Sequence, residues 1–74
     1  MSFQLKFSGD ICNARDKMGL TQLQVAERIS ISVRAYQYIE SGGEIPTLCN
    51  FFKLINLFEL DANDYRYLFH DPQA

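Results

Sequence analysis

The stretch LTQLQVAERISISVRAYQYIESG, residues 20–42, decides the fold of this 74-residue chain. Its apolar residues recur at helical spacing in two short runs, first Val25, Ala26 and Ile29, then Ala35, Tyr36 and Ile39. Thr21 and Ser32 stand where N-cap hydroxyls accept bonds from first-turn amides, and Gly42 can adopt the left-handed backbone that ends a helix. Helices of about nine residues are unstable alone, so the two must pack together. The pattern predicts a helix-turn-helix, whose second helix can lie in the DNA major groove.

An ordered set of residues in and around this stretch resembles the helix-turn-helix family of the phage lambda repressor and Cro proteins. The residues that carry the resemblance are Leu20, Thr21, Gln22, Val25, Ala26, Glu27, Ile31, Ser32, Ile39, Glu40, Gly42 and Pro46, with Ile11, Arg15, Gly19, Leu48, Leu54, Leu60 and Tyr65 around them. No single dipeptide in the set is specific to this family, but the ordered set over most of the chain is. The resemblance implies an all-α fold, a compact lambda-repressor-like domain of four to five helices.

We expect a single domain over residues 1–74, with an extended N-terminal arm at 1–8, the helix-turn-helix at 21–41 and a frayed tail at 71–74. The first helix should begin near Ser8 or Asp10, because Gly9 argues against a helix running from Ser2. Thr47 and Asp61 are N-cap candidates for two further helices, and the first of these is apolar nearly all round.

Composition excludes several function classes. The chain is 47% apolar but has no run of about 18 apolar residues that could span a bilayer, so no membrane association is expected. Cys12, Cys49 and the single His70 are too scattered for a metal site or a nucleophile-base pair. We therefore expect no enzyme activity, no metal and no cofactor, and a cytoplasmic protein, bacterial or phage-encoded and associated with the nucleoid.

Charge is the observation that fits DNA binding least well. The net charge is −2, whereas a DNA-binding domain usually carries a basic surface. Residues 1–41 hold five basic and four acidic side chains, and residues 42–74 hold two basic and five acidic ones. The half that contains the motif is the less repulsive to phosphate, although Glu44 replaces a residue that is often basic in the family.

The outward face of the second motif helix is the predicted reading surface. With Ala35, Tyr36 and Ile39 facing inward, the 100-degree step leaves five residues facing out, namely Val33, Arg34, Gln37, Tyr38 and Ser41. The resemblance places base contacts at 33, 34, 37 and 38. Arg34 can donate two bonds to guanine, Gln37 can pair with adenine, and Val33 can touch a thymine methyl. Tyr38 could bond a phosphate or stack on a sugar.

Phosphate anchoring is expected from the helix that begins after Thr21. Gln22 and the free amides there form a candidate anion site, and the amides around Gly43 form another. The resemblance also implies a structural ion pair between Arg15 and Glu40. The predicted DNA-binding set is Thr21, Gln22, Ser32, Val33, Arg34, Gln37, Tyr38, Ser41 and Gly43.

The apolar surplus of the C-terminal half has two interpretations. Either a small core consumes it, or a second subunit covers it in a homodimer through the C-terminal helices, at Phe51, Phe58, Tyr65, Tyr67 and Phe69. The expected function is a sequence-specific, DNA-binding regulator of transcription of phage-repressor type, with double-stranded DNA as its partner. The alternative is a protein-interaction module that binds a protein partner through its acidic, aromatic C-terminal half.

Overall fold

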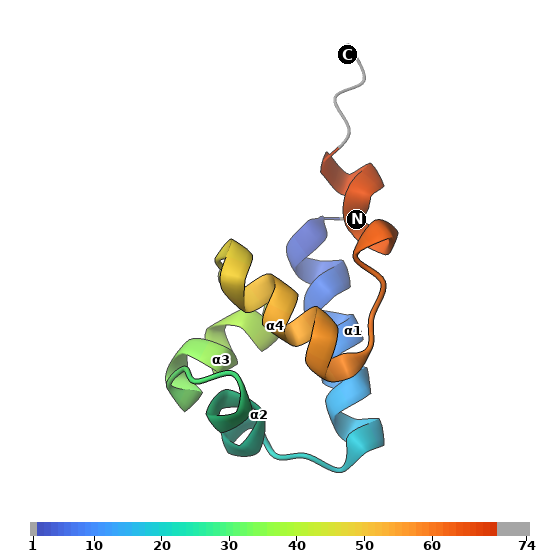
Figure 1. Ribbon diagram of the computed structural model, residues 1–74. Coiled ribbons are helices and arrows are strands. Elements are labelled where there is room, and N and C mark those ends of the chain that lie inside the picture. Colours follow the sequence, from blue (N-terminus) through green and yellow to red (C-terminus); the bar gives the residue numbers. More distant parts are fainter. Residues whose placement is uncertain (1, 70–74) are drawn as a thin grey trace.

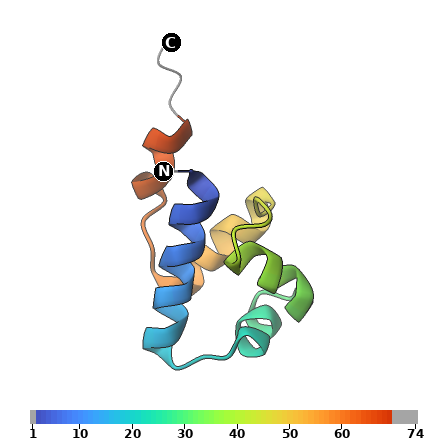
Figure 2. The same ribbon diagram turned by 180° about the vertical axis from the view of Figure 1, so that it is seen from behind.

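The computed structural model describes residues 2–69, and that part of the chain is helical with no strand (Figure 1). The elements are α1 (Phe3–Met18), α2 (Gln22–Arg28), α3 (Val33–Glu40), α4 (Leu48–Phe58) and the 3-10 helix η1 (Ala62–Phe69). Helices α2 and α3 pack on each other, α1 packs against α3 and α4, and η1 lies beside α1 (Figures 1 and 2). The predicted all-α fold is confirmed, while the predicted tail at 71–74 lies outside the described residues.

The prediction of an extended arm at 1–8 is wrong. Helix α1 starts at Phe3, and the Ser2 side chain caps it by accepting a bond from the Leu5 amide at 3.2 Å. Phe3 and Phe7 lie one turn apart and are buried with stacked rings 5.2 Å apart, whereas Leu5 faces solvent and is 64% exposed. Burying two phenylalanine rings is worth several kcal/mol, against about 1 kcal/mol for a glycine inside a helix. Burial therefore outweighs the helix-breaking tendency of Gly9.

Local sequence signals set the other helix ends as expected. The hydroxyls of Thr21, Ser32 and Thr47 accept bonds from amides three residues on, at 3.1, 3.0 and 3.2 Å. Gly19 and Gly42 follow α1 and α3 in left-handed conformations, with φ of 69° and 80°. Side chains close to each terminus in sequence thus satisfy helix ends that packing alone would leave unpaired.

Two residues take the left-handed conformation without being glycine. Ser30, in the turn between α2 and α3, has φ of 62°, and Glu59, after α4, has φ of 54°. A β-carbon in this conformation costs about 1 kcal/mol or more, so the fold accepts strain at both positions.

Most of the large apolar side chains of the C-terminal half that the structure describes are buried in the core or packed against it. Leu54, Ile55, Phe58 and Tyr65 are buried together with the core faces of α1, α2 and α3. Phe58 and Tyr65 are therefore not exposed for the dimer contact that the sequence led us to expect, and Phe51 is half-buried. The side chains of Tyr67 and Phe69 lie outside what the structure describes. The apolar residues of α4 that do face solvent are Leu48, at 73%, and Phe52.

A polar contact holds η1 against α1. The Tyr65 hydroxyl donates to Asp10 Oδ2 at 2.7 Å, and Lys6 pairs with the same oxygen at 3.0 Å while lying over the Tyr65 ring. Burial, reinforced by the hydrogen bond and the charge of Asp10, raises the pKa of Tyr65 above its ordinary value. The phenol therefore stays protonated and keeps donating at all physiological pH values.

Candidate nucleic-acid interface

Helices α2 and α3 form a compact helix-turn-helix unit. Thr21 and Gln24 make a reciprocal capping box at the start of α2, in which the Gln24 side chain accepts from the Thr21 amide at 2.8 Å. At the other end of α2, Lys53 reaches across from α4 and donates to the Ile29 carbonyl at 3.2 Å. The sequence offered no signal for that contact, because the two residues are 24 positions apart. This contact ties the C-terminal end of α2, where the turn to α3 begins, to α4.

The outward face of α3 is the predicted reading surface. Tyr36 and Ile39 are buried beneath the helix, and Arg34, Gln37, Tyr38 and Ser41 are exposed on its other side. Val33 was predicted to face outward but is half-buried and packs on the edge of the core, so only part of its side chain could touch a base. The four exposed residues lie along one face of a single rigid helix.

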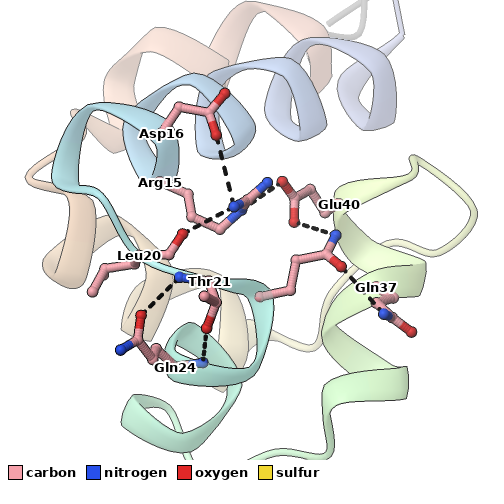
Figure 3. Close-up of polar contacts among 8 residues, drawn as sticks. Arg15, Asp16, Leu20, Thr21, Gln24, Gln37 and Glu40 are labelled. Atoms are coloured by element: carbon pink, nitrogen blue, oxygen red, sulfur yellow. Dashed lines mark hydrogen bonds and ion pairs between the residues drawn. The ribbon is translucent and has the colours of Figure 1, made fainter.

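Arg15 and Glu40 form the ion pair that the resemblance implied. Arg15 Nε donates to Glu40 Oε1 at 2.9 Å, and Arg15 Nη1 donates to the Leu20 carbonyl at 2.9 Å (Figure 3). The Glu40 side chain is 5% exposed and that of Arg15 is 17% exposed, whereas the 3.7 Å contact of Arg15 with Asp16 lies at the surface. The buried pair ties α1 to the end of α3.

Gln22, which the sequence predicted to anchor phosphate, is already hydrogen-bonded within the protein. Its Nε2 donates to Glu40 Oε2 at 2.9 Å, and its Oε1 accepts from Gln37 Nε2 at 3.2 Å. A half-buried chain of polar contacts therefore runs from Arg15 through Glu40 and Gln22 to Gln37 on the reading face. Sequence reasoning missed it because Gln22 and Glu40 are 18 positions apart and meet only when α2 packs on α3.

Gln37 keeps hydrogen-bonding capacity despite its bond to Gln22. An amide side chain has two N–H donors and a carbonyl oxygen. The bond to Gln22 uses one donor, so one donor and the oxygen remain. These are the two groups that a bidentate contact with adenine N7 and N6 requires. The contact with Gln22 thus fixes the Gln37 side chain and still permits the predicted base contact.

Several predicted DNA contacts are already used within the protein. The hydroxyls of Thr21 and Ser32 cap their helices. The Ser41 hydroxyl donates to the Tyr38 carbonyl at 2.9 Å, and the Gly43 amide donates to the same carbonyl and to Ser41 Oγ. A phosphate at Gly43 would have to displace those bonds. At the start of α2, within residues 2–69, only the amides after the cap, at positions 22 and 23, lack an acceptor.

Glu40 and Cys12 are two groups of the buried network whose pKa values are shifted. Burial opposes ionisation of Glu40, but polar contacts from Gln22, Cys12 and Arg15 and the charge of Arg15 outweigh it and hold the pKa of Glu40 below its ordinary value. The hydrogen bond to Glu40, with burial, raises the pKa of the Cys12 thiol, so the thiol is not a reactive thiolate. Glu40 is therefore ionised and neutralised inside the protein.

Tyr36 is buried beside this network. Its side chain is fully buried, and its hydroxyl has no hydrogen-bond partner within the part of the chain that the structure describes. Burial first, then the negative charge of Glu40, raises its pKa above the ordinary value. The phenol is thus neutral at all physiological pH values and contributes its ring to the packing.

Other classes of site find no support in residues 2–69. No group of three or more potential metal ligands occurs among them, and none of their helices is long and apolar enough to cross a membrane. Cys12 is half-buried and Cys49 is exposed.

Comparison with known proteins identifies the family to which the chain belongs. A family model described as helix-turn-helix matches residues 13–64, and the chain belongs to this family, of the lambda repressor and Cro type. It is similar to the cryptic phage CTXphi transcriptional repressor RstR of Vibrio cholerae serotype O1 (strain ATCC 39315 / El Tor Inaba N16961), with 32% identity over 60 residues. That alignment covers 81% of this chain and 54% of the relative, so the chain spans about half the length of that protein. No solved structure matches the chain significantly.

Proposed function

We propose that this protein is a sequence-specific DNA-binding regulator of transcription, of phage-repressor type. The observation that carries the proposal is the exposed face of α3, where Arg34, Gln37 and Tyr38 stand on a helix whose opposite side is buried and whose partner α2 completes a helix-turn-helix. Membership of the helix-turn-helix family and similarity to a phage transcriptional repressor support it.

The mechanism is occupation of a promoter or operator, with no catalytic step. Helix α3 enters the major groove, where Arg34 reads guanine and Gln37 reads adenine through bidentate contacts, and the exposed edge of Val33 meets a thymine methyl. The two free amides at the start of α2 and the caps around them position the unit on the phosphate backbone. Such a protein works in the bacterial cytoplasm at the nucleoid.

DNA binding can be tested by fluorescence anisotropy with a mixed-sequence duplex and then with a duplex selected by the protein from random DNA. We expect Arg34→Ala to weaken binding to the selected duplex by about 1 to 3 kcal/mol and to change non-specific binding little. Arg66→Ala is the matched control, because it removes the same charge from an exposed position in η1, outside the motif. Equal losses for both variants on every sequence would refute base reading.

The salt dependence of binding tests the electrostatic part of the proposal. Each phosphate contact contributes to the slope of log affinity against log salt, so a steep fall between about 50 and 200 mM salt is expected. The net charge of −2 opposes binding to phosphate, and Glu44, which follows the motif in sequence, is exposed. Absence of binding near 50 mM salt would reject DNA as the partner.

Dimerisation is the second part of the proposal. A two-fold dimer would read two half-sites about 34 Å apart. Because Phe58 and Tyr65 are buried, the contact has to use other residues of the C-terminal half, among which Leu48 and Phe52 are exposed. Sedimentation analysis with and without a palindromic duplex tests this. A monomer that binds single half-sites without cooperativity would contradict it.

A protein-interaction module is the second candidate function, and one observation favours it. Phe3, Ile45, Pro46, Leu48 and Phe51 line an open apolar cavity of about 360 Å³ at the start of α4. A charged substitution at Leu48 separates the two functions when the oligomeric state is measured as well. Leu48→Glu should leave DNA binding by a single domain intact, and a loss of activity in cells with both DNA binding and the oligomeric state unchanged would favour the protein-interaction function.

A further inference from the structure

The exposed face of α3 contains a contact between two exposed side chains, those of Arg34 and Tyr38. The guanidinium carbon of Arg34 lies over the Tyr38 ring, 6.0 Å from its centroid. The two residues are four positions apart and so occupy neighbouring turns on one side of the helix. The distance is at the outer limit at which a cation is attracted to the face of an aromatic ring.

Hydrogen bonds fix the backbone from which the Tyr38 side chain extends. The residue is 44% exposed, and its carbonyl accepts from both the Ser41 hydroxyl and the Gly43 amide, which fixes the last turn of α3. A β-carbon on Gly43 would lie 4.0 Å from Tyr38 Cδ1, so the ring lies near the backbone that follows the helix. The point at which the Tyr38 side chain leaves the backbone is therefore fixed.

Arg34, in contrast, has no fixed partner apart from that ring. Within residues 2–69 no carboxylate forms an ion pair with it, since the ion pairs involve Lys6 and Arg15. An arginine side chain that is free to rotate loses about 2 kcal/mol of rotamer entropy when it is fixed against a base. A ring that restricts the guanidinium beforehand reduces this loss, which is the general effect of preorganisation.

We infer that Tyr38 is a positioning residue that acts through Arg34. Its ring holds the guanidinium for a bidentate contact with guanine, and it strengthens the preference for guanine without touching the base itself. The inference rests on the proposed function, because it requires α3 to lie in the major groove. It differs from the sequence-based expectation, in which Tyr38 bonds a phosphate or stacks on a sugar. In that case its hydroxyl or its contact with the backbone would matter for every DNA sequence alike.

The test uses Tyr38→Phe, which keeps the ring and removes the hydroxyl, and Tyr38→Leu, which removes the ring and keeps an apolar side chain. The measured quantity is the ratio of affinities for a selected duplex and the same duplex with guanine replaced by adenine at the position read by Arg34. We expect Tyr38→Phe to keep the ratio within about twofold. Tyr38→Leu should lower it about two- to fivefold, the range that exposed cation–π contacts produce. In an Arg34→Ala background, Tyr38→Leu should have no further effect on the ratio.

Two outcomes would overturn the inference. Equal weakening of all sequences by Tyr38→Phe and Tyr38→Leu would assign Tyr38 to a phosphate. A persistent effect of Tyr38→Leu in the Arg34→Ala background would assign it a direct contact with DNA. Circular dichroism of each variant controls for folding.

A measurement without DNA separates this inference from the proposed function. The Arg34 side-chain protons should show an upfield ring-current shift by NMR in the wild type and in Tyr38→Phe, and lose it in Tyr38→Leu. Loss of that shift with no change in the guanine ratio would refute the inference and leave DNA binding standing. If the wild type binds no duplex, the proposed function fails and the inference fails with it, whatever the ring-current shift shows.

Discussion

Replacement of Arg15 by alanine is the change that tests the internal polar network most directly. The substitution removes the bond to Glu40 and the bond to the Leu20 carbonyl, and it leaves the Glu40 carboxylate in place. That carboxylate is 5% exposed, so its charge is left without a cationic partner in a largely desolvated place. The remaining polar contacts of Glu40, chiefly the bond from Gln22, do not carry a compensating charge.

The magnitude follows from this geometry. Removing one partner of a buried pair costs about 3 to 5 kcal/mol. Arg15 retains some exposure, at 17%, and Glu40 keeps its bond to Gln22, so we expect a loss near the lower limit, about 3 kcal/mol of the free energy of unfolding. That is a large part of the stability of a small domain.

The pH dependence of the loss gives a second signature. The folded pKa of Glu40 lies below its ordinary value of 4.5, so its contribution is fully present above that value and is lost as the pH falls through the folded pKa. In Arg15→Ala, the bond and the charge that lower the pKa of Glu40 are lost. Burial, which raises that pKa, then dominates, and the pKa of Glu40 should rise above 4.5. Protonation then relieves the buried charge, so the gap between wild type and variant should narrow from pH 7 to pH 4.

Urea denaturation followed by circular dichroism at both pH values measures these quantities. Lys17→Ala is the matched control, because Lys17 is an exposed cation on the same helix and should change stability by no more than about 0.5 kcal/mol. A loss below about 0.5 kcal/mol for Arg15→Ala, or a gap that widens at acid pH, would refute the assignment of a stabilising buried pair.

Three further substitutions test separate features by thermal or urea unfolding. Gly9→Ala should stabilise the protein by about 0.5 to 1 kcal/mol, because Gly9 lies inside α1 and a β-carbon there meets nothing within 4 Å; destabilisation would contradict the continuous helix. Gly42→Ala should cost about 1 kcal/mol from its φ of 80°, and a neutral result would mean that the turn relaxes. Tyr36→Phe should leave stability unchanged or raise it by about 1 kcal/mol, since the buried hydroxyl has no partner; a loss above about 1 kcal/mol would reveal a hydrogen bond.

Local chemistry was predictable and long-range contacts were not. The caps at Thr21, Ser32 and Thr47 follow from side chains within three residues of the amides that they bind, so a single sequence contains the information. The pair between Arg15 and Glu40 was implied only by the family resemblance, because 25 positions separate the two residues.

The errors share one physical cause, which is tertiary burial. Gly9 lowers helix propensity locally, but Phe3 and Phe7 gain more by entering the core as part of one helix. Phe58 and Tyr65 looked available for a partner subunit, and the small core consumes them. Gln22 was predicted to anchor phosphate, yet α2 packs so closely on α3 that its side-chain amide bonds Glu40 and Gln37 instead.

The left-handed residues Ser30 and Glu59 bear on how many substitutions the fold can carry. Glycine at either position would relieve about 1 kcal/mol of strain, partly offset by greater freedom of the unfolded chain, for a net gain of about 1 kcal/mol from the two together. A variant with both glycines would be a more tolerant background for combined changes at Arg34 and Tyr38. In the natural chain the strain at these two positions lowers the free energy of unfolding. Fewer further mutations therefore leave the protein folded at its working temperature.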